Sequence, residues 1–198
     1  MKIGKIFYFI FVFALFNMPL KAADFCACCA EQGQYLINVS KPTRQEIEIL
    51  KGIQFATANL YTTAAFPENI KGISVLGDSY SVNGAFQNNL WKFNFTDDKN
   101  KNGSLLLPMP ETMVAFETDL YDRDESHSSG PILYKEWRFK FKVRQGTGIF
   151  QTGIAPLTEY FLVLQGRGNN CPNVSDFKHW RLEVTGKRAS YAFFGKLK

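Results

Sequence analysis

Six residues of the chain have side chains suited to metal binding, redox chemistry or proton transfer. They are Cys26, Cys28, Cys29, Cys171, His127 and His179. Thiolates and imidazoles are the ligands that zinc and copper prefer, so these residues could form a metal site. The sequence lacks a second closely spaced pair of ligands, and the export signal discussed below favours disulfides. We therefore expect disulfides, with no metal and no cofactor.

The spacing of the cysteines limits how they can pair. Cys28 and Cys29 are adjacent, and neighbouring Cα atoms lie about 3.8 Å apart, closer than the roughly 4.4 to 6.8 Å of an ordinary disulfide. A bridge from Cys26 to Cys28 is also tight. We predict that Cys26 pairs with Cys29 and that Cys28 pairs with Cys171. The second bridge would tie the start of the chain to its body, and in the entropic model it contributes about 4 to 5 kcal/mol.

The two histidines suggest acid–base chemistry. His179 follows Asp176 by three residues, and His127 lies in the polar stretch 122–130, which holds carboxylates and hydroxyls. A hydrolase using His179 or His127 with neighbouring acids is therefore an alternative function. Such groups are recognised by geometry in space, and the chain has no Gly-x-Ser-x-Gly motif. An exposed loop and a hydrogen-bonded histidine at a strand end explain the same residues.

The stretch Asp98–Gly103 matches the first half of a calcium-binding loop. Position 12 of that loop would be Met109, where a bidentate glutamate is required. Asn102 and Gly103 also form the strongest short hairpin signal. We therefore predict a hairpin turn here.

A row of basic residues is the most directional surface feature of the sequence. It consists of Lys135, Arg138, Lys140, Lys142 and Arg144. Arg138, Lys140, Lys142 and Arg144 are our candidate site for an anionic polymer or for lipid headgroups. The alternative is a solvated strand face whose lysines discourage pairing between sheet edges.

The first 22 residues resemble a secretory signal peptide. Lys2 and Lys5 precede an apolar run from Ile6 to Phe16, and Ala22 suits cleavage. The apolar run is shorter than the roughly 20 residues of a membrane span. Cleavage would lower the net charge from +5 to +2, because three lysines leave with the signal, and this balance argues against nucleic-acid binding. We expect a secreted or periplasmic protein with no transmembrane segment in the mature chain, consisting of a cysteine-rich segment (23–33) and one β domain (34–198).

Alternating apolar and polar residues recur along this domain, most clearly in Leu90–Phe95, Trp137–Val143 and Trp180–Val184. Such alternation is typical of half-buried antiparallel strands. The run Tyr160–Leu164 is apolar at every position and predicts a central strand covered on both faces. A capping-box spacing of Thr43 and Glu46 favours one short helix within Ser40–Gly52, although period-two spacing also fits there.

The pattern predicts an all-β fold, an antiparallel meander of about ten short strands. The expected strands are Gln34–Val39, Gln54–Thr62, Tyr80–Gln87, Leu90–Phe95, Ser104–Leu107, Met113–Thr118, Trp137–Val143, Gly148–Gly153, Tyr160–Gln165, Trp180–Val184 and Ser190–Lys196. Their separations are too short for crossover helices. Barrel-like closure is favoured because hairpins dominate after Trp137, and a β-sandwich is the alternative.

These features indicate a non-catalytic exported protein, monomeric, that binds a ligand of unknown identity. The ligand would be either a small molecule inside a barrel or an extracellular polymer on its outer face. The hydrolase and a structural component of the cell envelope remain as alternatives.

Overall fold

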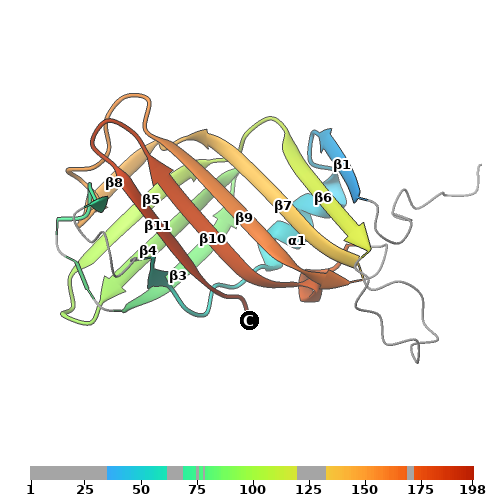
Figure 1. Cartoon of the computed structure of the whole chain (residues 1–198), viewed down its shortest axis with the longest axis horizontal. Helices are drawn as coiled ribbons and strands as arrows, with labels where there is room; N and C mark the ends of the chain where they lie inside the picture. The colour runs from blue at the N-terminus through green and yellow to red at the C-terminus, as the bar shows by residue number, and fades with distance from the viewer. Residues whose placement is uncertain (1–34, 62–68, 75, 78, 120–132, 169–171) are drawn as a thin grey trace, which may run out of the picture.

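The strands form two separate antiparallel sheets (Figure 1). The computed structural model describes residues 35–61, 69–74, 76–77, 79–119, 133–168 and 172–198. The seven-stranded sheet has the order β1 (Tyr35–Ser40), β6 (Met113–Asp119), β7 (Leu133–Lys142), β9 (Glu159–Gly168), β10 (Phe177–Thr185), β11 (Ser190–Lys196) and β2 (Asn59–Leu60). The four-stranded sheet has the order β3 (Tyr80–Gln87), β4 (Leu90–Asp97), β5 (Asn102–Pro108) and β8 (Gln145–Gly148). The all-β class and the antiparallel pairing are confirmed.

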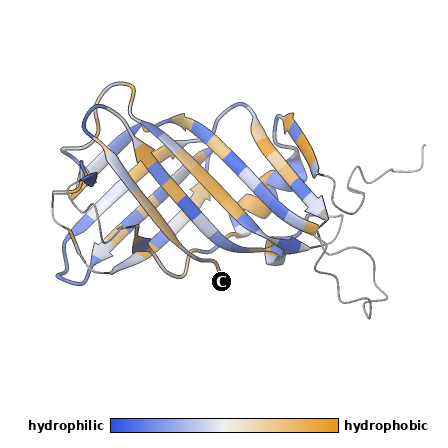
Figure 2. Ribbon diagram, viewed as in Figure 1, coloured by the Kyte–Doolittle hydropathy of each residue, from blue (hydrophilic) through white to orange (hydrophobic). Residues whose placement is uncertain are grey.

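Aromatic side chains fill the space between the two sheets. The ring centroid of Phe93 on β4 lies 5.9 Å from that of Trp180 on β10, and Phe95 lies 4.7 Å from Phe193 on β11. All four side chains are buried. The alternating hydrophobic and hydrophilic bands along the strands in Figure 2 reflect this packing, because successive side chains of a strand point to opposite faces.

The favoured barrel-like closure is not confirmed. At one side of the molecule a single bridge joins Ala58 to Tyr80 on β3. At the other side the Arg144 N–H donates to the Leu106 carbonyl at 3.0 Å, where the chain leaves β7 and enters β8 of the other sheet. Within the described residues, the two sheets thus touch at their edges without forming one continuous cylinder.

The predicted helix is confirmed as α1 (Arg44–Gly52), and the period-two interpretation of these residues is wrong. The Glu46 N–H donates to Thr43 Oγ1 at 3.2 Å, and the Thr43 N–H donates to Glu46 Oε2 at 2.7 Å, so the capping box is complete. Leu50 is fully buried, which anchors the helix to the core at one end of the sheets. Within the described part of the chain, none of the helices has the length and apolar character that a membrane crossing requires.

Two loops, the β4–β5 turn and the segment after β8, can be compared with the sequence predictions. The hairpin turn between β4 and β5 is confirmed, since Asn100 has a φ of 60° and the Asp97 carboxylate accepts from the N–H groups of Lys99 and Lys101. The Asn-Gly signal itself is wrong, because Asn102 and Gly103 lie in β5, opposite Thr96 and Phe95. The predicted strand Gly148–Gly153 is wrong. β8 ends at Gly148, and the Phe150 N–H then donates to the Thr147 carbonyl in a turn.

β9 lies in the middle of the seven-stranded sheet, as the run Tyr160–Leu164 predicted. Tyr160, Leu162 and Leu164 are buried among the core residues. Among the described residues, no strand or helix covers the outer face of β9, so the expectation that chain covers both faces is not confirmed there. There Phe161 is only half-buried, and Val163 is 4% exposed although it points away from the core.

A charged cluster lies inside the fold. It includes Lys135, which the sequence had placed in the exposed basic row. Lys135 is in phase with the inward residues Trp137 and Phe139, and it is 1% exposed. Its Nζ donates to Asp176 Oδ2 at 3.0 Å, and that oxygen also accepts from the Asn173 N–H at 3.1 Å in the short helix η2 (Val174–Asp176). Lys135 therefore fastens η2 to the sheet and is not part of the exposed row.

Glu117 lies opposite Lys135 in the register of β6 and β7. Burial raises the pKa of the Glu117 carboxyl above its ordinary value, while the charge of Lys135 opposes this effect. The ionised carboxylate therefore costs folding free energy at neutral pH.

We predict that replacing Lys135 destabilises the protein strongly. Lys135→Met leaves Asp176 buried without its cation, which costs about 3 to 5 kcal/mol in the free energy of unfolding measured by urea denaturation. Adding Asp176→Asn, which keeps an acceptor for the Asn173 N–H, should recover most of that loss. Lys142→Met, at an exposed position of the same strand, is the control and should change stability by less than about 0.5 kcal/mol. A Lys135→Met variant as stable as the control would contradict a fastening role.

The raised pKa of Glu117 predicts a pH-dependent effect of Glu117→Gln. Because the folded pKa is above the ordinary value of 4.5, the folded protein takes up a proton before the unfolded chain as the pH falls. The stability advantage of Glu117→Gln over the parent is therefore largest above the folded pKa and shrinks as the pH falls toward 4.5. Urea denaturation of both proteins at several pH values measures this difference. An advantage that grows on acidification would show that Lys135 lowers the pKa instead.

Candidate functional site

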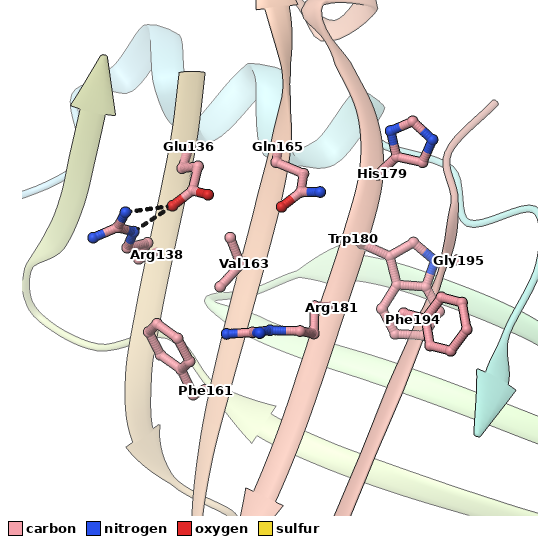
Figure 3. A pocket seen from close by; sticks show the side chains of 10 residues that line it. All are labelled: Glu136, Arg138, Phe161, Val163, Gln165, His179, Trp180, Arg181, Phe194 and Gly195. Carbon is pink, nitrogen blue, oxygen red and sulfur yellow. Dashed lines mark hydrogen bonds and ion pairs between the residues drawn. The ribbon is translucent and has the colours of Figure 1, made fainter. Parts of the chain in front are cut away.

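A hollow of about 530 Å³ lies on the outer face of the seven-stranded sheet (Figure 3). Four neighbouring strands, β7, β9, β10 and β11, supply its lining. The lining residues are Glu136, Arg138, Phe161, Val163, Gln165, His179, Trp180, Arg181, Phe194 and Gly195. Most of them are the outward residues of the strands, placed side by side by the register that pairs Val163 with both Arg138 and Arg181.

Two further hollows continue the first one along β10 and β11. A hollow of about 410 Å³ shares Arg181 and Phe194 with it, and a hollow of about 290 Å³ shares Tyr61, Glu183 and Ala192 with the second. The lining includes all four outward residues of β10 between His179 and Thr185, a distance of about 20 Å at the rise of a strand. We call this feature the outer groove.

The bottom of the outer groove is apolar. Val163 lies at the bottom of the first hollow, and in Figure 3 the side chain of Arg181 extends across β9 between Val163 and Phe161. Phe194 is 44% exposed, and its ring meets that of Tyr61, which is 59% exposed, edge to face at 6.3 Å. Ala192 lines the second hollow with these two rings. Its small side chain leaves room there.

The polar side chains of the groove form ion pairs along its length. Arg138 contacts Glu136 Oε2 through both Nε and Nη2 at 2.5 Å, and Arg181 Nη2 lies 3.0 Å from Glu183 Oε1. The guanidinium of Arg138 also lies over the ring of Phe116, 4.9 Å from its centroid. The four charged residues thus carry two positive and two negative charges.

Tyr134 supports Glu136 at the margin of the groove. Its hydroxyl donates to Glu136 Oε1 in a short hydrogen bond. Burial, together with this bond to Glu136, raises the pKa of Tyr134 well above its ordinary value. The phenol therefore stays protonated at neutral pH and acts as a donor.

The structure does not bring the predicted hydrolytic residues together. His179 lines the outer groove, whereas the Asp176 carboxylate is bound to Lys135 inside the fold. His179 and Glu136 both pair in register with Gln165, from opposite sides, so two strand spacings of about 5 Å separate their backbones. No group of three His, Cys, Asp or Glu that could hold a metal occurs in the described ranges. His127 lies outside them.

Only one residue of the candidate anion site lines the outer groove, namely Arg138. Lys140 is exposed and lies 3.2 Å from Glu159. Lys142 and Arg144 are exposed where the chain passes from β7 to β8. Anion binding by these four residues stays a prediction.

The four cysteines, Cys26, Cys28, Cys29 and Cys171, all lie outside the described residues. The predicted disulfides therefore stay a prediction. The leader 1–22 and the segment 23–33 lie outside them too.

Sequence reasoning missed most of the groove residues. Phe161 and Phe194 occupy outward positions of their strands, where the alternation would place polar residues. An aromatic residue in the polar phase of a strand was a signal that could have indicated a binding surface. Arg181 and Glu183 were recognised only as the polar phase of β10.

Comparisons of the chain with protein-family models, with curated proteins and with solved structures found no match.

Proposed function

We propose that this chain is an exported, non-catalytic binding protein that holds an extended polymer in the outer groove. The observation that carries the proposal is the continuity of the groove, in which three hollows share residues along β10 and β11. An extended trough with exposed rings suits a chain-like ligand better than a compact one. Covering the exposed apolar surface of these rings with a ligand removes it from water, and this stabilises the complex.

The core argues against a small ligand held inside the fold. Trp91, Trp137 and Trp180 are buried between the sheets together with several phenylalanines. We interpret the two sheets as the faces of a β-sandwich, with binding on the outside of the larger one. Of the two ligands expected from sequence, we therefore propose the polymer on the outer face and not the small molecule inside the fold.

The geometry of the groove favours binding over catalysis. Glu136 and Glu183 each lie in an ion pair with an arginine, and neither carboxylate lies beside a histidine in register. His179 lies on the opposite side of the sheet from Asp176. The ion-paired side chains can therefore contact and orient a ligand. They do not form an acid–base pair with His179.

Export is proposed from the leader 1–22 and from the four cysteines, which suit an oxidising compartment. The intact mass of protein produced through a secretory route should lack about 22 residues. Alkylation before reduction should leave its mass unchanged, because Cys26, Cys28, Cys29 and Cys171 are paired. An uncut leader, or four alkylated thiols, would overturn this part of the proposal.

The groove itself is tested by filling it. Ala192→Trp places a large ring in the second hollow, so it should abolish retardation of the protein in gels that contain a bound polymer. The gels should carry hydroxyethylcellulose, xyloglucan, galactomannan, polygalacturonate or heparin, one polymer per gel. Phe141→Ala is the matched control because Phe141 is 46% exposed on the same sheet but lies outside the groove lining.

The wild-type protein and Phe141→Ala should be retarded alike by at least one polymer. Thermal melts of the variants check that each remains folded. Retardation that Ala192→Trp leaves unchanged would move the binding site elsewhere and refute the proposed function. Retardation by heparin alone, lost on reversing Lys140 and Lys142, would instead support the anion site.

A further inference from the structure

We infer that the polymer bound in the outer groove is a neutral polysaccharide; this inference rests on the proposed function of the groove. Three properties of the described residues lead to this ligand class. They are the shape of the aromatic surface, the mixture of hydrogen-bonding groups and the balance of charge.

The aromatic surface offers a place for a sugar ring. Tyr61 and Phe194 meet at 74° with Ala192 beside them in the same hollow, and this leaves an apolar corner open to solvent. Phe161 provides a third ring in the first hollow. A pyranose has a face of C–H groups that packs against aromatic rings, and its hydroxyls then point sideways. Both parts of the sugar therefore find matching surface in the groove.

The polar side chains around these rings match hydroxyl groups. Glu136 and Glu183 accept hydrogen bonds, Arg138 and Arg181 donate them, and the Gln165 amide does both. A hydroxyl is both donor and acceptor, so it can bind at either member of an ion pair. The ion pairs also fix the directions of these side chains before the ligand arrives, which reduces the entropy lost on binding.

The balance of charge favours a neutral ligand. Arg138 lies against Glu136, and Arg181 lies against Glu183, so a polyanion would meet a carboxylate beside each guanidinium. Lys142 and Arg144, which could favour an anion, do not line the groove. Binding should therefore depend little on salt.

The backbone around the groove argues against a peptide ligand that joins the sheet as a strand. In that mode an extended peptide adds to a free sheet edge. The groove lies over the face of β9, β10 and β11, each of which pairs with neighbours on both sides. The main chain there has no row of free N–H and C=O groups for a peptide to pair with. A sugar polymer needs only the side chains.

The test measures the affinity of the full protein for soluble polymers by affinity electrophoresis and titration calorimetry. We expect binding to at least one of hydroxyethylcellulose, xyloglucan and galactomannan. Between about 0.05 M and 1 M NaCl the affinity should change less than about twofold. Phe194→Ala should weaken it roughly 10- to 100-fold, whereas Phe141→Ala should leave it unchanged. Arg181→Gln should weaken it, and Lys142→Gln should not.

The outcomes separate this inference from the proposed function. Binding of polygalacturonate or heparin alone, with steep salt dependence and lost in Ala192→Trp, would refute the neutral ligand while the groove keeps its function. Failure of all neutral polymers to bind would refute the inference as well. Neutral polymers bound equally by the wild-type protein and by Ala192→Trp would overturn both.

Discussion

The packing of aromatic rings between the two sheets is the interaction on which the rest of this structure depends. Phe93 stacks on Trp180, and Phe95 packs against Phe193, so the inner face of each strand is fixed by rings from the opposite sheet. Side chains alternate along a strand, and a shift of one residue would move every ring to the solvent side. Because Trp180, Leu182 and Val184 point inward, His179, Arg181 and Glu183 must point outward.

The outer groove follows from this constraint together with the pairing of the strands. Antiparallel register places Arg138, Val163, Arg181 and Phe194 next to one another, although they come from four strands. Among the described residues, Val163 is then surrounded by the charged and aromatic side chains that line the first hollow. Each arginine lies next to a carboxylate two residues away on its own strand, at 2.5 Å for Arg138 and 3.0 Å for Arg181. The result is an apolar strip with ordered polar sides.

The interior also contains a cluster of charged side chains, which are costly to remove from water. A lysine and two acids lie where the inner face of β7 meets η2, and Asp176 also caps η2. Buried ion pairs add little net stability compared with apolar packing, but they are costly to break. Their role here is to fix one geometry, with Lys135 holding the segment that follows β9. Lys135 belongs to the basic row in sequence, but it has the phase of Trp137 and therefore points inward.

The sequence by itself determined the class of the fold, the helix and most of the strands. These depend on local patterns, such as the alternation around Trp137 and Trp180 or the capping box of Thr43 and Glu46, which each strand or helix carries within its own residues. Only the tertiary structure decided how the sheets meet and which residues form the site. Pairing of the non-consecutive strands β7 and β9 placed Phe161 beside Lys140, and the hairpin of β10 and β11 placed Ala192 beside Glu183. No local pattern encodes that register, because it is set by the packing of both sheets at once.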